Sequence, residues 1–184
     1  MKQYGLKASL VIAGVIFLGI KSLCAQTAGE YLQNGNDYFR QGDYDQAIYD
    51  YTKAIDINPN LAKAYDNRGV AYAQRGYLAP AIADFTMAIA DNPKDAEAYN
   101  NRGHAYAELG NLPQAITDYS KAVWINAIYV KAYNNRALAY YVLKDYAKAW
   151  ADVNKVKEIG GTMDPNFIEG LKKASDKEKL APKN

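Results

Sequence analysis

Side chains able to act as a nucleophile, a general base or a metal ligand are scarce in this sequence. It contains one histidine, His104, and one cysteine, Cys24. A serine hydrolase site would need a serine beside His104, and after residue 25 only Ser120 and Ser175 remain. A zinc site needs more histidine or cysteine ligands than this chain has, and no glycine-rich phosphate loop is present. The sequence therefore predicts no catalytic residue, no metal site, no cofactor and no enzyme activity.

Carboxylates remain as candidates, because a pair of acids can form a hydrolytic site. The acids, however, mostly recur at one spacing. Asp50, Asp84, Asp118 and Asp152 are separated by steps of 34 residues. A residue that returns at a constant step indicates a repeated structural position, so we interpret these carboxylates as part of the architecture.

The same 34-residue step organises the chain from residue 28 to residue 163. Two tyrosine positions, two alanine positions and one glycine position recur with it. The fourth copy departs from the pattern by replacing the glycine with Ala137. Recurring residues include Tyr31, Tyr65, Tyr99 and Tyr133; Tyr38, Tyr72, Tyr106 and Tyr140; Ala47, Ala81, Ala115 and Ala149; and Gly35, Gly69 and Gly103.

Within each copy, the spacing predicts two helices joined by a tight turn. In the second copy Tyr65, Gly69 and Tyr72 lie four and three residues apart, which places them on one helical face. Residues 81–88 repeat this spacing on a second helix, and Gly76 between them can adopt the positive φ that ends a helix. A helix–turn–helix unit of this length and pattern resembles the tetratricopeptide repeat (TPR) family.

The resemblance implies an all-α fold: a right-handed α-solenoid of four TPR helix-turn-helix repeats plus a C-terminal capping helix. One unit cannot bury its apolar face alone, so units stack and the last one needs a cap. Asp164 and Pro165 are suited to begin this capping helix. The predicted segments are TPR 1 at 28–61, TPR 2 at 62–95, TPR 3 at 96–129, TPR 4 at 130–163, the capping helix at 164–175 and a disordered tail at 176–184.

The N-terminus is typical of an exported protein. Lysines precede an apolar run from Ala8 to Ile20, which has the length of a signal peptide and is short for a membrane span. We predict that residues 1–25 are a signal peptide cleaved after Ala25, which makes the mature protein periplasmic or secreted. An uncleaved segment would instead anchor it in the inner membrane. Lipidation of Cys24 is disfavoured by the residues that precede it.

The charge balance argues against a nucleic-acid partner. The full chain carries 22 basic and 20 acidic residues, and removal of residues 1–25 leaves 19 basic residues against 20 acidic ones. A nucleic-acid-binding domain would carry a clear excess of basic residues. Nucleic acid is therefore not expected as a partner, and membrane contact is expected only if the signal segment is retained. The resemblance to TPR proteins implies that the partner is another protein.

Arginine recurs near the repeated aspartates, at Arg68, Arg102 and Arg136, whereas the first copy has Asn34. Each arginine could pair with the aspartate of the preceding unit or with that of its own unit, and both schemes give three pairs. Because Asn34 replaces arginine where no unit precedes, we favour pairing across unit boundaries. The favoured structural pairs, each worth at most about 1 kcal/mol, are Asp50–Arg68, Asp84–Arg102 and Asp118–Arg136.

In TPR proteins the first helices of the units line a concave groove that receives peptides, and this resemblance identifies candidate binding residues. Asn67, Asn101 and Asn135 share one repeated position on these helices, with Gln33 in the first copy. An amide can donate and accept hydrogen bonds, so this asparagine ladder could grip the backbone of an extended peptide. Alternatively, the asparagines hydrogen-bond a neighbouring helix. The candidate groove residues are Gln33, Asn36, Phe39, Lys63, Asp66, Asn67, Val70, Glu97, Asn100, Asn101, His104, Lys131, Asn134, Asn135, Leu138 and Tyr141.

We expect a non-catalytic protein-protein interaction scaffold in the cell envelope that binds an extended peptide segment of a partner. The carboxylate clamp of TPR chaperone adaptors is matched at two of its five positions, where Asn36 and Asn67 stand at its asparagine positions. Its basic residues are replaced by Leu32, Glu97 and Asn101, so we do not expect that clamp. Alternatives are a self-assembling or structural envelope component using its helix faces, or an accessory subunit of an envelope complex. The oligomeric state is left open.

Overall fold

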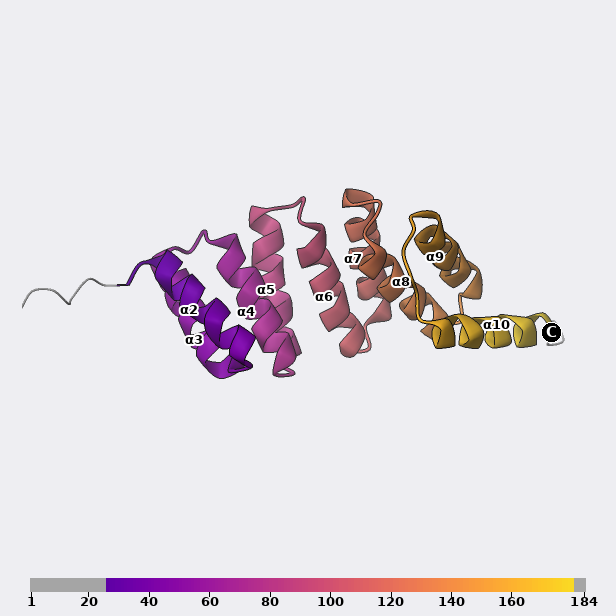
Figure 1. Ribbon diagram of the computed structural model, residues 1–184, viewed down its shortest axis with the longest axis horizontal. Helices are drawn as coiled ribbons and strands as arrows, with labels where there is room; N and C mark the ends of the chain where they lie inside the picture. Colours follow the sequence, from indigo (N-terminus) through magenta and orange to yellow (C-terminus); the bar gives the residue numbers. More distant parts are fainter. Residues whose placement is uncertain (1–25, 181–184) are drawn as a thin grey trace, which may run out of the picture.

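The computed structural model describes residues 26–180, which form a row of nine α-helices without strands (Figure 1). The predicted signal peptide at 1–25 and residues 181–184 lie outside the described residues. Within 26–180, no helix combines the length and the apolar character that crossing a bilayer requires. The helices are α2 (Ala28–Gln41), α3 (Tyr44–Ile57), α4 (Ala62–Gln74), α5 (Leu78–Asp91), α6 (Ala96–Glu108), α7 (Leu112–Ile125), α8 (Val130–Val142), α9 (Tyr146–Glu158) and α10 (Pro165–Leu180).

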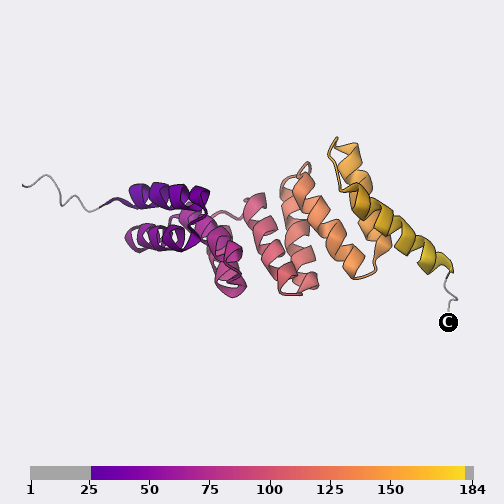
Figure 2. The same cartoon turned by 60° about the horizontal axis from the view of Figure 1, so that its bottom comes forward.

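The helices pack in pairs that stack along the row, as both views show (Figures 1 and 2). The pairs are α2 with α3, α4 with α5, α6 with α7, and α8 with α9. The first helices of successive pairs also contact one another, α2 with α4, α4 with α6 and α6 with α8. These first helices therefore line the inner, concave side of the stack, and the predicted all-α solenoid is confirmed.

The turn inside each unit uses a left-handed backbone conformation. Gly42, Gly76 and Gly110 have φ angles of 81°, 76° and 78°. Lys144 takes the corresponding place in the fourth unit, with a φ of 62°. Side chains disfavour this region because the Cβ approaches the backbone, so the fourth turn carries strain that the first three avoid.

Glycine on the first helix lets the two helices of a unit approach closely. A Cβ on Gly69 would lie 2.8 Å from the ring of Phe85, and one on Gly35 would lie 2.6 Å from the ring of Tyr51. Both distances are shorter than packed atoms allow. The large ring of the second helix therefore fills the space that the glycine leaves, which explains why the two residue types recur together.

The predicted pairing of aspartate and arginine across unit boundaries is wrong. Nε and Nη2 of Arg68 donate to the two carboxylate oxygens of Asp84 in its own unit, at 2.7 and 2.9 Å. The two helices of one unit pack more extensively than helices of neighbouring units do, so the side chains between them meet first. Towards the preceding unit, Arg68 donates to Thr52 and not to Asp50. The same bidentate pairs join Arg102 to Asp118 and Arg136 to Asp152.

The capping helix continues further than predicted. Helix α10 ends at Leu180, so residues 176–180, assigned to a disordered tail from the sequence, are helical. Glu169 and Lys173 form an ion pair one turn apart on this helix, which supports its helical conformation. Leu171 is fully buried against α9, so α10 closes the apolar end of the stack.

Candidate functional site

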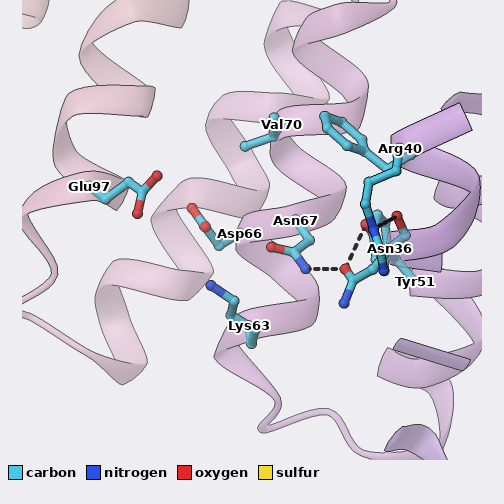
Figure 3. Close-up of a pocket in the computed structure, with 9 residues that line it drawn as sticks. Asn36, Arg40, Tyr51, Lys63, Asp66, Asn67, Val70 and Glu97 are labelled. Carbon is cyan, nitrogen blue, oxygen red and sulfur yellow. Dashed lines mark hydrogen bonds between the residues drawn. The ribbon is translucent and has the colours of Figure 1, made fainter. Parts of the chain in front are cut away.

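Two hollows lie along the concave side formed by the first helices. Each has a volume of about 280 Å³; one lies at α2, α4 and α6, the other at α6 and α8. The first is lined by Asn36, Phe39, Lys63, Asp66, Asn67, Val70 and Glu97, all predicted, together with Arg40 and Tyr51 (Figure 3). The second is lined by the predicted His104, Asn135 and Leu138, with Ala107, Glu108, Leu112, Tyr119, Ala139 and Val142.

Asn36 is the hydrogen-bonding centre of the first hollow. Its side-chain oxygen accepts from the Tyr51 hydroxyl at 3.0 Å and from the Asn67 amide at 2.7 Å. Figure 3 shows these bonds joining α2, α3 and α4 at the edge of the hollow. They fix the rotamers of Asn36 and Asn67 in the unbound protein, so the wall of the hollow is preorganised.

The asparagine ladder bonds the neighbouring helix, which was one of its two predicted interpretations. Asn135 donates to the side chain of Asn100 at 2.9 Å, just as Asn67 donates to the preceding first helix. Asn101 hydrogen-bonds Asp66, again one unit back. These bonds use the amide N–H groups. The side-chain oxygens of the ladder are still acceptors that a backbone N–H of a ligand can use.

Asp66 is the most perturbed acid of the first hollow. It is only 9% exposed, and its Oδ1 has no hydrogen-bond partner among residues 26–180. Burial, aided by the negative charges of Asp95 and Glu97, raises the pKa of Asp66 to about 6, although Lys63 and a hydrogen bond from Asn101 act to lower it. Figure 3 places Lys63 and Glu97 near Asp66. The charge of this hollow therefore changes in mildly acidic solution.

The second hollow is more apolar. Leu138 and Val142 on α8 are 52% and 59% exposed, although large apolar side chains usually avoid water. On α6, His104 lies 3.6 Å from Glu108 and pairs with it when the imidazole is protonated. The concave side thus combines amides and mixed charges near α4 with an apolar wall on α8.

Two predicted groove residues are engaged within the stack, Asn100 by burial and Asn134 by a hydrogen bond. Asn100 is fully buried, and its Nδ2 has no partner within the described part of the chain. It lies between the first helices, beneath the groove surface, because its position faces the next unit. Asn134 occupies the same repeated position and donates to the backbone oxygen of Thr162 at 3.2 Å. Both residues therefore hold the stack together.

The remaining predicted residues lie outside the hollows or in other contacts. The ring of Tyr141 lies 5.6 Å from that of Phe167 on α10, so it packs against the cap and ends the groove. Gln33 donates to Asp37 on its own helix at 3.2 Å. Lys131 is exposed on α8 and lines neither hollow.

Sequence reasoning missed the part that core tyrosines play in the hollows. Tyr51 and Tyr119 are each only 1% exposed, and neither was among the candidate groove residues. The Tyr51 hydroxyl nevertheless reaches Asn36, and burial raises the pKa of Tyr51 to about 12, so it acts as a donor. One feature of the sequence could have indicated this bond. The first unit has Tyr51 where the second unit has Phe85, and only a tyrosine carries the hydroxyl that donates to Asn36.

Family models match a large central part of the chain. The model described as TPR repeat matches residues 35–76 and 71–110, and the model described as Tetratricopeptide repeat matches residues 96–127. Among curated proteins, Hsp70-Hsp90 organizing protein 1 of Arabidopsis thaliana is 51% identical over 39 residues, which are 21% of this chain. The match spans only 7% of the length of that protein.

Solved structures extend the likeness over most of the stack. The first TPR of Spaghetti (RPAP3), bound to the HSP90 peptide SRMEEVD, is 33% identical with a TM-score of 0.63, covering 64% of this chain and 93% of that one. The second TPR domain of human RPAP3, in complex with the HSP70 peptide SGPTIEEVD, is 28% identical with a TM-score of 0.59, covering 61% and 93%. MamA shares the fold, with 22% identity and a TM-score of 0.71, covering 86% and 96%.

The repeated residues, the stacked helix pairs and the family models lead to one conclusion. The chain belongs to the tetratricopeptide repeat family.

Proposed function

We propose that this protein is a non-catalytic interaction scaffold that binds an extended segment of a partner protein along its concave side. The observation that carries the proposal is the pair of hollows on the first helices, each with a ladder asparagine and an apolar wall. The likeness to TPR domains solved with HSP90 and HSP70 peptides supports it.

Binding would use groups that are already in place. The side-chain oxygens of Asn67 and Asn135 accept backbone N–H groups of the segment. Apolar side chains of the segment contact Val70 in the first hollow, and Leu138 and Val142 in the second. Because hydrogen bonds to neighbouring helices hold the asparagines, little ordering cost falls on association.

The charges favour an internal segment over an acidic chain end. Arg40 and Lys63 in the first hollow are opposed by Asp66 and Glu97. Arg40 is also paired with Asp37 on its own helix. Because the charges of this hollow are mixed in sign, its electrostatic potential does not favour a carboxylate ligand. Binding of an acidic chain end such as EEVD would need a positive potential.

We further propose that the protein acts in the cell envelope, after export and cleavage behind Ala25. The support is the sequence of residues 1–25, with lysines before an apolar run of signal-peptide length. Mass spectrometry of the protein recovered from periplasm and medium tests this. An N-terminus at Gln26 is expected, and an intact N-terminus in the membrane fraction would show an anchored protein instead.

A second candidate, assembly through helix faces, is favoured by one observation. Trp124 at the end of α7 and Ile128 in the following turn are 75% and 71% exposed. The ammonium of Lys121 lies 3.9 Å from the Trp124 ring centre and covers part of it. Sedimentation of the wild type and of Trp124→Ser distinguishes the two functions. A dimer that the substitution dissociates would support assembly.

The groove proposal is tested by affinity capture with residues 26–184 as bait. Leu138→Lys places a charge in the second hollow without removing any hydrogen bond, so the fold is retained. Asn67→Ala combined with Asn135→Ala removes the ladder acceptors. Asn154→Ala is the control, because it makes the same substitution at an exposed asparagine of α9 that lines neither hollow. A partner retained by wild type and Asn154→Ala but lost from both groove variants is expected. Equal retention by all four baits would overturn the groove.

A further inference from the structure

Three units contain an arginine paired with an aspartate, and at Arg68, as at Arg136, two tyrosine rings flank the guanidinium. The guanidinium of Arg68 forms a two-pronged contact with Asp84, with N–O distances of 2.7 and 2.9 Å. Its Cζ lies 5.6 Å from the ring centre of Tyr65 and 5.8 Å from that of Tyr72. A planar fork on a carboxylate, flanked by aromatic rings, suits arginine and not the single ammonium of lysine.

The first unit keeps this environment and lacks the arginine. One repeat earlier in the chain, the two rings are Tyr31 and Tyr38, and the carboxylate is Asp50. The arginine position is held by Asn34, whose shorter side chain carries no charge. The arrangement that binds arginine inside the other units is therefore present here without its cation.

Asp50 is little exposed as a residue, and its carboxylate has no partner among residues 26–180. It is 7% exposed, much like the paired Asp84 at 5%. Within residues 26–180 no hydrogen bond or ion pair reaches it, and burial raises its pKa. A recessed carboxylate that has neither a cation nor a donor from the protein is available to a cation of the right shape, which would gain a charge-assisted contact here.

A hollow gives access to this carboxylate from solvent. It has a volume of about 650 Å³ and is lined by Tyr31, Asn34, Tyr38 and Asp50, with Gln26 and further side chains of α2 and α3. No unit precedes α2 in the described residues, so this face of the stack is its open end. None of its lining residues lines either groove hollow, and the two sites are separate.

We propose that Asp50, Tyr31 and Tyr38 form a binding site for a guanidinium group supplied by an arginine side chain of a partner protein. The carboxylate takes the two parallel N–H groups, and the two rings contact the guanidinium from the sides, as Tyr65 and Tyr72 contact Arg68. The site does not depend on peptide binding in the groove.

The arginines of this chain are already engaged, which favours a second molecule as the donor. Each lies in an ion pair, and residues 1–25 contain no arginine. These pairs are Arg40–Asp37, Arg68–Asp84, Arg75–Asp45, Arg102–Asp118 and Arg136–Asp152.

The test is an NMR titration of the protein with three blocked pentapeptides, Ala-Ala-X-Ala-Ala, in which X is arginine, citrulline or lysine. Citrulline has the shape of arginine and no charge. The arginine peptide is expected to bind about tenfold more tightly than either of the others, with shifts at Asn34 and Asp50. Arginine amide in a fourth titration separates a small guanidinium ligand from a peptide: tighter binding of the pentapeptide supports a protein partner.

Two variants make the test decisive. Asn34→Arg should close the site by forming the pair with Asp50 that the other units have, which abolishes peptide binding while the fold is retained. Asp50→Asn should also abolish binding, whereas Asp56→Asn, an exposed carboxylate on the same helix, should not. Equal affinity for the arginine and citrulline peptides, or unchanged binding by Asn34→Arg, would overturn the proposal. Neither result would bear on the groove, which Leu138→Lys tests by itself.

Discussion

The first unit and the unit that follows it use the same aspartate position in opposite ways. In the second unit Asp84 holds Arg68 between two rings, and the pair is sealed between helices. In the first unit Asp50 is almost as little exposed, but its carboxylate opens into a hollow that Asn34 also lines. The difference teaches that one substitution at the end of a repeat array can leave an internal contact unmade and open to solvent, while the aspartate and the two tyrosine positions are kept in the sequence.

The largest effect is expected from removing the two aspartates in turn. Asp84→Ala leaves the guanidinium of Arg68 buried without its carboxylate, and should lower the free energy of unfolding by about 3 kcal/mol. Asp50→Ala removes an unpaired carboxylate and should be neutral or slightly stabilising. Urea unfolding followed by circular dichroism measures both. Equal losses would mean that Asp50 has a stabilising partner after all.

Asp66 is a second carboxylate that lacks a complete set of hydrogen-bond partners, and the pH dependence of stability tests its effect. Its pKa of about 6 in the folded protein lies above the unfolded value of about 3.9, so the folded state binds its proton more tightly. The stability that this group contributes is therefore fully present below about pH 4 and is lost as pH rises through 6, by about 3 kcal/mol. Asp66→Asn should flatten the difference in unfolding free energy between pH 4 and pH 7. A parallel pH profile for variant and wild type would contradict it.

The close helix approach distinguishes the first three units from the fourth. Gly69→Ala forces a Cβ against the Phe85 ring at 2.8 Å and should destabilise by between about 1 and 2 kcal/mol. The fourth unit carries Ala137 at this position and Val153 at the ring position, so Ala137→Gly should cost about 1 kcal/mol through backbone entropy alone. Thermal unfolding of both variants is the measurement, and a stabilised Gly69→Ala would refute the steric argument.

The smallest effect, and the most direct test of the comparison, is Asn34→Arg. If the first unit is equivalent to the others, the new arginine should pair with Asp50 and raise the free energy of unfolding by about 1 kcal/mol. Asn34→Lys is the matched control, because an ammonium cannot make the two-pronged contact and should give less. The same gain from both would show general charge compensation without the specific geometry.

The repeated pattern was sufficient to predict the fold, because glycine, alanine and tyrosine at constant steps leave few ways to pack two helices. It could not decide which aspartate each arginine binds. Arg68 is 18 residues after Asp50 and 16 before Asp84, and both separations are compatible with helix pairs. The answer depends on how far two helices overlap, which is a property of the packed backbone and not of residue spacing.

The sequence indicated which side of the stack the candidate residues lie on, but it indicated less well which residues each of them contacts. Exposed side chains such as Lys63 and Leu138 lie on the concave side as expected. Asn100 was predicted to line the groove surface but is fully buried. Residue spacing does not determine how much of a first helix is buried between its neighbours. The hydrogen bond between Tyr51 and Asn36 could not be predicted either, because the repeat pattern assigns these two residues to separate faces.

The arginines have a consequence for how this chain unfolds. Arg68, Arg102 and Arg136 each bind the aspartate of their own unit. Through Nη1, each of these three also donates to a hydroxyl of the unit before it: Thr52, Thr86 and Ser120 at 3.0, 3.1 and 3.0 Å. When one unit opens, the next loses a partner for a mostly buried cation. Opening at one place therefore weakens the adjacent unit, and this nearest-neighbour coupling makes four small units unfold as one cooperative array.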